Sequence, residues 1–263
     1  MTFSTSPDSR DPDRPIRVGV AGLGAVAQAV HLPLLARRPE AFRIAALADL
    51  SASLRTAIGD RYGVATGARY RTVAELLGDD DLDGVILLTS GSHGADALSA
   101  LERGLPILCE KPLSYTLAEA DRLAASAVRD RLLLGYMKVF DPAVEEAARI
   151  VADPSSGLGP LRAIEVAVLH PTSASQLAFA NLLPPAGDVD PTVLAALRAG
   201  TDELVRAAIG PAADDLGEVY AGILLSSLVH ELSVIRAVAG DLVAVDWADA
   251  WASTADAPGS LLL

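Results

Sequence analysis

Only two lysines occur in this chain, against nineteen arginines. Lys111 lies in the segment Cys109-Glu110-Lys111-Pro112, and Lys138 ends the segment Gly135-Tyr136-Met137-Lys138. A lysine ammonium is a compact proton donor with an adjustable pKa, whereas a guanidinium stays charged. The two lysines are therefore candidates for chemistry. The alternative is a bias towards arginine that left two lysines by accident.

A glycine-rich turn follows the first apolar run. The residues Gly22-Leu23-Gly24-Ala25-Val26-Ala27 have the G-x-G-x-x-G/A spacing of a dinucleotide-binding turn between a strand and a helix. Gly22 permits the tight turn, Gly24 lets a pyrophosphate approach the backbone, and Ala27 lets the helix pack closely on the sheet. The exposed amides at the helix start attract phosphate. We expect cofactor contacts at Gly22, Gly24, Ala25 and Val26.

Asp49 ends the second expected strand, where a carboxylate would accept hydrogen bonds from the adenosine ribose hydroxyls. It would also repel a 2′-phosphate, so NAD is favoured over NADP. Ser51 and Arg55 could soften this preference. The alternative is an ordinary glycine turn, with Asp49 capping the next helix.

Short apolar runs alternate with helix-period segments, which is typical of βαβ units and a parallel sheet. Two helices should begin with capping boxes, at Thr72 to Glu75 and at Thr116 to Glu119. The expected strands are Ile16–Ala21, Phe42–Ala48, Ala68–Arg71, Gly84–Thr89, Pro106–Cys109 and Leu132–Met137.

The pattern changes after Met137. We expect a helix over Pro142–Ala152, a strand over Leu161–His170, a helix over Glu218–Ala239, a strand near Leu242–Trp247, and the start of another at Ser260–Leu263. The Pro-, Asp- and Ala-rich stretch Pro171–Gly217 is an insertion or lid to which we assign no chemistry.

The bulk composition excludes several classes of protein. A net charge of −13 repels nucleic acid and anionic membranes, so we expect neither as a partner. The single cysteine cannot form an internal disulfide, and no Cys/His spacing predicts a metal site. Residues 1–15 have no apolar signal segment, and we find no apolar run of membrane-spanning length. We expect a soluble, cytoplasmic protein with a disordered tail at 1–15.

Several motifs together resemble the Gfo/Idh/MocA oxidoreductases over about residues 16 to 170. The resemblance implies an NAD-binding Rossmann domain at 16–138, followed at 139–263 by a substrate and oligomerisation domain with an open, mostly antiparallel sheet. The motifs are Gly22-Leu23-Gly24, His31-Leu32-Pro33, Ala48-Asp49, Thr89 with His93, Cys109-Glu110-Lys111-Pro112-Leu113 and Phe140-Asp141-Pro142.

The resemblance also implies roles for single residues. Lys111 would be catalytic and hydrogen-bond the substrate oxygen, aimed by a cis peptide bond before Pro112. Glu110 would orient that lysine or be a plain strand-end carboxylate. Thr89 and His93 would lie near the cofactor, with His93 supporting it or simply capping a helix. Lys138 would contact substrate or cofactor, or lie solvated at the domain edge.

The second catalytic motif of the relatives departs from its usual form here. It is Asp-x-x-x-His with a further Asp three residues on, but Ser226 and Ser233 occupy both Asp positions around His230. Helical periodicity puts Leu224, Leu228, Leu232 and Ile235 on one stripe, and Ser226, His230, Ser233 and Ala237 on the other side. His230 would accept the substrate proton, with Ser226 and Ser233 as substrate contacts. The alternative is a surface histidine. Glu231 does not restore the motif, because neighbouring helix residues point about 100° apart.

The expected function is NAD-dependent interconversion of a secondary alcohol and a ketone on a sugar, cyclitol or related polyol, with NADP as an alternative cofactor. Two other functions stay open: a non-catalytic dinucleotide-binding sensor or scaffold, and an NAD-using, glycoside-cleaving relative. Relatives have more strands after the segment corresponding to Val243–Leu263, so we expect either a truncated product or a sheet that a partner subunit completes. Relatives usually associate through the outer face of this sheet, which makes a homo-oligomer the expected assembly.

Overall fold

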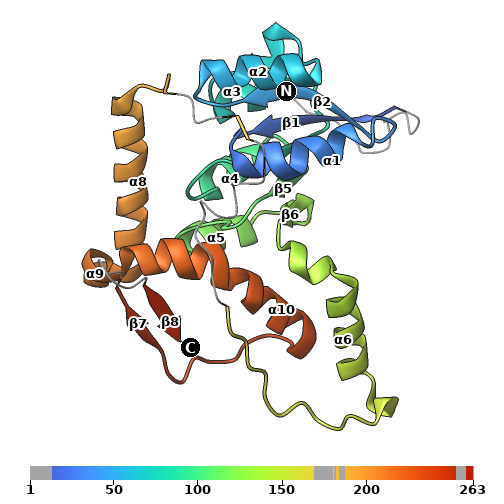
Figure 1. Ribbon diagram of the computed structural model, residues 1–263, viewed down its shortest axis with the longest axis vertical. Helices are drawn as coiled ribbons and strands as arrows, with labels where there is room; N and C mark the ends of the chain where they lie inside the picture. Colours follow the sequence, from blue (N-terminus) through green and yellow to red (C-terminus); the bar gives the residue numbers. More distant parts are fainter. Residues whose placement is uncertain (1–13, 169–179, 181, 184–186, 253–258, 263) are drawn as a thin grey trace.

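The computed structural model describes residues 14–168, 180, 182, 183, 187–252 and 259–262. Its main feature is a sheet of six parallel strands in the order β3-β2-β1-β4-β5-β6 (Figure 1). This is the strand order of the Rossmann fold, whose ligand crevice lies where the order reverses beside β1. The strands are β1 (Ile16–Ala21), β2 (Phe42–Ala48), β3 (Arg69–Tyr70), β4 (Gly84–Leu87), β5 (Ile107–Cys109) and β6 (Leu132–Leu134).

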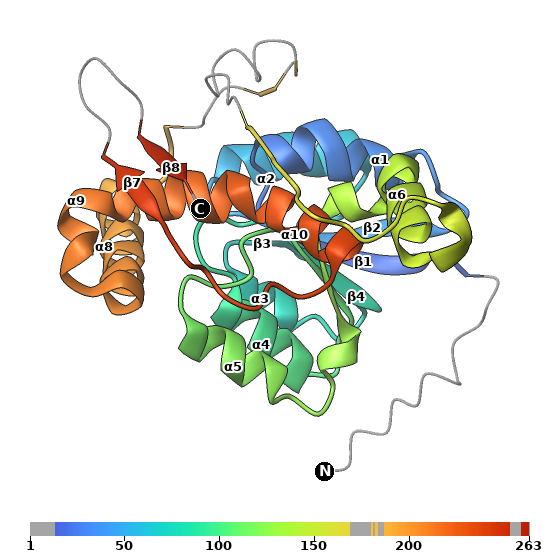
Figure 2. The same cartoon turned by 90° about the horizontal axis from the view of Figure 1, so that it is seen from below.

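All six strands confirm the expectation, although β4 and β6 end earlier than predicted. The sheet lies between two helical layers (Figure 2). One layer holds η2 (Ala27–His31), which continues into α1 (Leu32–Ala36), and α2 (Ala52–Tyr62). The other holds α3 (Val73–Leu77), α4 (Gly94–Glu102) and α5 (Leu117–Ala124).

Alternating strand residues supply a separate core to each layer. Val20 and Leu47 pack with the helices of the α1 and α2 layer, and Ala21 and Leu87 pack with the opposite layer. All four are at most 1% exposed. Each large apolar side chain buried in this way contributes about 1.5–3 kcal/mol relative to an exposed one.

Both predicted capping boxes are present. The Thr72 and Thr116 hydroxyls accept hydrogen bonds from the amides of Glu75 and Glu119, and each Glu side chain accepts from the amide of its Thr. Short helical turns join other elements of this half: η3 (Thr66–Ala68), η4 (Arg129–Arg131) and η5 (Met137–Phe140).

The rest of the chain is mainly helical in the part that the structure describes. The predicted helix α6 (Pro142–Ala152) is confirmed, and η6 (Pro154–Ser156) follows it. The elements α8 (Pro191–Ile209), η7 (Gly210–Ala212), α9 (Ala213–Glu218), η8 (Val219–Leu228) and α10 (Val229–Ala239) complete it. The helix predicted for Glu218–Ala239 is therefore confirmed, with a π-helical first part. Helix α10 packs against α6 and η5.

Of the open, mostly antiparallel sheet expected at 139–263, the described residues contain one small antiparallel part, which includes the strand expected to start at Ser260. Their strands in this half are β7 (Asp249–Trp251) and β8 (Ser260–Leu262), which form one antiparallel pair. Residues 161–168 and 242–247 form no strand. Apolar residues alternate in both segments, but a strand also needs a neighbouring strand to pair with, which this pattern does not provide. Val243 in the second segment is 99% exposed. His170 and Pro171 lie outside the described residues.

Two expectations from composition also need correction. Arg14 belongs to the predicted tail, yet its guanidinium makes an ion pair of 2.7 Å with Asp83. The helical stretch Pro191–Ala239 is, by length and composition alone, long and apolar enough to cross a membrane. This is weak grounds for a membrane span, because helices of soluble proteins also meet such a criterion.

Candidate functional site

The glycine turn after β1 has the form that a bound pyrophosphate requires. Gly22 has a φ of 89°, and a Cβ there would lie 2.6 Å from the Leu88 main chain. A Cβ on Gly24 would meet no atom within 4 Å, whereas Ala27 is fully buried against the sheet. Val26 is 44% exposed. The turn is closed towards the sheet and open at Gly24, on the side where a phosphate would approach.

Asp49 ties this turn to the end of β2. Its Oδ2 accepts a hydrogen bond of 2.8 Å from the Leu23 amide, and its Oδ1 accepts one of 2.8 Å from the Ser51 amide. Each carboxylate oxygen has a further lone pair with which it can accept from a ribose hydroxyl. The contact with Leu23 was not predicted, since strand-end position alone does not reveal it.

Lys111 leaves the end of β5 towards the C-terminal helices. The Lys111-Pro112 peptide bond is cis, in agreement with the resemblance. The Lys111 Nζ donates a hydrogen bond of 2.7 Å to the carbonyl oxygen of Ser226. Ser226 lies in η8, four residues before His230, so the ammonium reaches the helical stretch that carries the second candidate.

Glu110 holds the main chain at Lys111. Its Oε2 accepts from the Lys111 amide at 3.2 Å, and its Oε1 pairs with Nε2 of His31 at 3.0 Å. Burial raises the pKa of Glu110, but the hydrogen bond and charge of His31, together with Lys111, outweigh burial and lower it overall. Glu110 therefore orients the turn and His31 instead of the lysine ammonium.

His230 is buried, with 8% of its surface exposed. Its Nδ1 has no hydrogen-bond partner among the described residues, and its ring meets that of Tyr136 edge-on with centroids 6.4 Å apart. Burial, followed by the charges of Lys111 and Lys138, lowers the pKa of His230. The ring is therefore neutral near pH 7 and able to accept a proton.

The two serines in place of the usual carboxylates do not orient this ring. The Ser226 hydroxyl donates to the Gly222 carbonyl, and the Ser233 hydroxyl donates to the His230 carbonyl at 2.6 Å. Hydroxyls bonded back to their own helix in this way are a common state of serine within helices. A substrate contact at Ser226 or Ser233 stays a prediction.

The most buried residues of this helix do not lie on its apolar stripe. Ser227, His230 and Glu231 are buried, whereas the four residues of the stripe, Leu224, Leu228, Leu232 and Ile235, are only half-buried. A rotation of 100° per residue does not hold through the π-helical η8.

Lys138 lies at the edge of the same site. Its ammonium forms an ion pair with a carboxylate oxygen of Glu231, while the other oxygen of Glu231 is buried without a partner among the described residues. The charge of Lys138 also contributes to the lowered pKa of His230. Glu231 therefore faces Lys138 and does not replace the missing carboxylate.

His93 joins two loops at the carboxyl ends of the strands. Its Nδ1 lies 2.7 Å from the Pro112 carbonyl oxygen, and its Nε2 lies 2.8 Å from the carbonyl oxygen of Thr89. It is 1% exposed. His93 does not cap α4 with its side chain. Its position is that of a support, which connects the loop after β4 to the turn that carries Lys111.

The described part of Pro171–Gly217 also reaches the cofactor turn. The Leu183 amide donates to Oε1 of Gln28 at 2.9 Å, and Asp188 accepts from the Ser53 amide at 2.8 Å. No sequence pattern predicted these contacts, which join residues more than a hundred positions apart. This stretch was expected to have no assigned chemistry.

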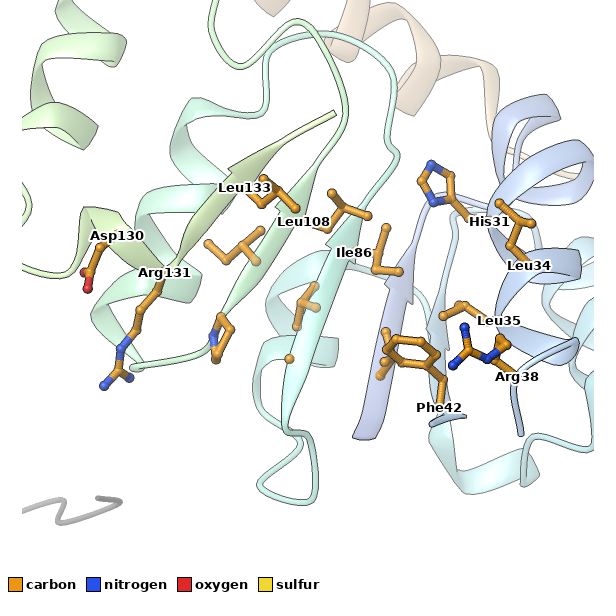
Figure 3. Close-up of a pocket in the computed structure, with 15 residues that line it drawn as sticks. His31, Leu34, Leu35, Arg38, Phe42, Ile86, Leu108, Asp130, Arg131 and Leu133 are labelled. Atoms are coloured by element: carbon orange, nitrogen blue, oxygen red, sulfur yellow. The ribbon is translucent and has the colours of Figure 1, made fainter. Parts of the chain in front are cut away.

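A cavity of about 630 Å³ lies away from these residues (Figure 3). Ile86, Leu108 and Leu133 point into it from β4, β5 and β6, and His31 and Leu34 border it on the η2 and α1 side. Of the residues discussed above, only His31 lines it. The cavity covers the middle of the sheet face instead of the carboxyl ends of the strands, and we assign it no role.

Cys109 is a buried free thiol next to this site. Burial, with the nearby charges of Glu110 and Asp96, raises the pKa of the Cys109 thiol to about 12. The thiol stays protonated at neutral pH and is a poor nucleophile. Among the described residues no group of three or more His, Cys, Asp or Glu could hold a metal ion.

Comparison with known proteins agrees with this geometry. Residues 16–137 match the model of the Gfo/Idh/MocA group, described as an oxidoreductase family with an NAD-binding Rossmann fold. Inositol 2-dehydrogenase 1 of Saccharopolyspora erythraea is 32% identical over 146 residues, covering 54% of this chain and 43% of that protein. D-xylose 1-dehydrogenase (NADP(+)) 2 of Haloferax volcanii is 36% identical over 141 residues, covering 51% and 40%.

Among solved structures, apo scyllo-inositol dehydrogenase from Lactobacillus casei aligns with a TM-score of 0.47 and 21% identity, over 53% of this chain and 41% of that chain. The chain spans less than half the length of the curated relatives that it matches.

Proposed function

We propose that this chain is an NAD-dependent dehydrogenase of a sugar, cyclitol or related polyol, because residues 16–137 match the model of the Gfo/Idh/MocA oxidoreductases, an NAD-binding Rossmann family. It would interconvert a secondary alcohol and a ketone. NADP is the alternative cofactor. The substrate would be a small molecule, and the protein would be cytoplasmic and form a homo-oligomer through its C-terminal strands.

One observation carries the proposal: the Lys111 ammonium reaches the helical stretch that bears a buried, neutral His230. Lys111 donates to Ser226, and its charge also acts on His230. An ammonium has three donors, of which one binds Ser226, so within the described part of the chain two remain to bind a substrate oxygen. The two side chains that the reaction needs therefore face one region from two different parts of the chain.

The residues of the glycine turn fit the cofactor. Gly22 leaves no space for a Cβ, while Gly24 is open, and Asp49 fixes the turn and can accept from a ribose hydroxyl. The nicotinamide ring, when bound, accepts or supplies the hydride at the carbon that bears the reacting oxygen.

The chain's own residues would then handle the proton and the oxygen. In the oxidising direction His230 takes the hydroxyl proton, and Lys111 stabilises the negative charge that develops on the oxygen. In the reducing direction the protonated His230 returns the proton. Glu110 and His93 hold the main chain on both sides of Lys111.

The test is hydride transfer by the full chain with NAD and a broad panel of polyols, followed through the nicotinamide absorbance. We expect turnover with at least one polyol. Lys111→Ala should lower kcat by about a hundredfold or more, as for the loss of other charge-stabilising donors, while NAD binding is kept. Turnover that survives Lys111→Ala would contradict the mechanism.

The serines at positions 226 and 233 favour a second function, a non-catalytic dinucleotide sensor, because His230 lacks an orienting carboxylate. In that case the chain would bind NAD but turn over no polyol in the same panel. A glycoside-cleaving relative would instead cleave a glycosidic bond without net consumption of NAD.

A further inference from the structure

A carboxylate from outside the Rossmann domain lies at the start of α2. Asp188 comes from the stretch before α8, and its Oδ2 accepts a hydrogen bond of 2.8 Å from the amide of Ser53. The Ser53 amide, followed by the Ser51 hydroxyl, lowers the pKa of Asp188. The Ser53 amide lies at the N-terminal end of α2, where amides and the helix dipole favour an anion. An anionic group of this chain therefore already occupies that position.

The stretch that carries Asp188 is attached to the cofactor turn at a second point. The amide of Leu183 donates to Gln28, whose own Nε2 donates to the Leu23 carbonyl at 2.8 Å. The Leu183 side chain packs against the core beneath η2 and α1. Helix α8 then begins level with the Rossmann sheet (Figure 1). The stretch that carries Asp188 is therefore held at two points, by Leu183 at Gln28 and by Asp188 itself at Ser53.

Ser51 interacts with both Asp49 and Asp188. The Ser51 amide donates to Asp49 at 2.8 Å, while the Ser51 hydroxyl helps to lower the pKa of Asp188. In a Rossmann domain the carboxylate at the position of Asp49 binds the ribose 2′-hydroxyl. A phosphate on that hydroxyl would extend past Asp49 towards the first turn of α2. The Ser53 amide that it would need there already binds Asp188.

We propose that Asp188 is a specificity-determining residue, which occupies the place of a 2′-phosphate and makes the site select NAD over NADP. The inference rests on the proposed dinucleotide site. Rejection has two physical causes: the phosphate finds the Ser53 amide occupied, and it meets a like charge. Of the five donors of the Arg55 guanidinium, one is already engaged by the main-chain carbonyl of Asp49. NAD has a free hydroxyl at this position and needs only Asp49.

The test is calorimetric titration of the full chain with NAD and with NADP, for the wild type and the variants Asp188→Asn and Asp188→Ser. Asn keeps an acceptor for the Ser53 amide without the charge, and Ser removes the carboxylate that binds this amide. We expect NADP affinity to rise about tenfold or more in both variants, the scale of one hydrogen bond to a charged group, and to rise most in Asp188→Ser. NAD affinity should change by less than about twofold.

Asp190→Asn is the matched control. Asp190 also lies at the start of α8, but its carboxylate accepts from Thr192 within its own helix, and Asn caps a helix as well as Asp does. The control should leave the preference for NAD unchanged. In the wild type, higher salt should reduce that preference, because it screens the repulsion between Asp188 and the 2′-phosphate.

The outcomes separate this inference from the proposed function. An equal rise of NAD and NADP affinity in Asp188→Ser would mean that Asp188 merely obstructs the groove, and it would overturn the specificity role. A shift of the same size in Asp190→Asn would also overturn it, since any nearby charge would then suffice. If the wild type and all variants bind neither dinucleotide, the proposed function itself fails.

Discussion

The candidate catalytic residues are Lys111 and His230. His230 lacks the carboxylates that usually accompany the histidine of this motif. Lys111 is held by its main-chain contact with Glu110 and by the Ser226 carbonyl. His230 is held by burial and by Tyr136, with its Nδ1 unpaired among the described residues. A ring without an orienting acceptor can adopt either tautomer. We therefore expect a slower proton transfer than a carboxylate-backed histidine would give.

The lowered pKa of His230 makes a prediction about pH. Oxidation of the polyol needs the neutral ring, so kcat/KM should stay level as pH falls through 6.5, the usual histidine value, and should decline only below it. The measurement is the pH profile of kcat/KM in the oxidising direction. Lys138→Met should move the inflection upwards, because it removes one of the charges that lower this pKa. An inflection above pH 6.5 in the wild type would contradict the assignment.

Sequence predicts single residues well where a local pattern fixes them. The glycines at 22 and 24, Asp49 and the turn at Lys111 follow from motif spacing, and each lies at or just after the carboxyl end of a strand of the parallel sheet. The contacts of Glu110 with His31 and of Asp188 with Ser53 could not be predicted. They join residues 79 and 135 positions apart, and no spacing rule encodes such pairs.

The two capping boxes have the same pattern in different surroundings. The box at Thr72 is exposed, and Glu75 accepts from the amides of Arg71 and Thr72. The box at Thr116 is covered: Glu119 is 6% exposed and accepts from Ser92 as well as from the Tyr115 and Thr116 amides. Glu119 thereby connects α5 to the loop after β4, close to His93.

This difference predicts unequal costs for the same substitution. Glu119→Ala should lower the free energy of unfolding by about 2 kcal/mol or more, since it leaves buried donors without a partner. Glu75→Ala is the matched control and should cost clearly less, because water can replace the lost carboxylate. Urea denaturation of both variants measures the difference. Equal losses would show that the burial of Glu119 adds nothing to the shared capping bonds.

A strand could be predicted where the sequence shows both its apolar pattern and the neighbouring strands with which it pairs. The six strands alternate with helices, which predicts a parallel sheet, and the glycine turn after β1 predicts the Rossmann order in which β1 pairs with both β2 and β4. The segments 161–168 and 242–247 had the pattern without the partners, and the structure forms no strand there. The register of η8 was unpredictable for another reason, because π-helical turns have no clear sequence mark.

At the scale of the molecule, a three-layer Rossmann domain carries most of the described core (Figure 2). The helical stretch that bears His230 contacts Lys111, and the segment before α8 brings Asp188 to α2. The Rossmann domain could be predicted from the alternation of short apolar runs with helix-period segments. The arrangement of the C-terminal half could not, because it depends on contacts such as Lys111 with Ser226 and Tyr220 with Tyr115.

Buried His230 and half-buried Glu110 make the whole molecule sensitive to acid. The folded-state pKa of His230 is lowered, so its unfolded form takes up protons first, and stability should fall as pH drops below about 6.5. The pKa of Glu110 is also lowered, and its contribution is lost as pH falls below about 4.5. Urea denaturation across pH should therefore show two declines, measured in high salt to screen the net charge of −13.

His230→Gln is the control for the upper decline, since glutamine does not titrate. This variant should lose stability only in the lower window. If the decline near pH 6 persists in His230→Gln, another group causes it and the assigned pKa shift is wrong.

The most direct test of the account is calorimetric titration of the full chain with NAD for the wild type and the variants Gly24→Ala and Gly67→Ala. A Cβ at either glycine meets no atom within 4 Å, so both variants should fold normally. Only the Cβ at Gly24 would stand where the pyrophosphate approaches. The account predicts that Gly24→Ala weakens NAD binding by about tenfold or more while Gly67→Ala binds like the wild type. Equal binding by all three proteins, or none by the wild type, would contradict it.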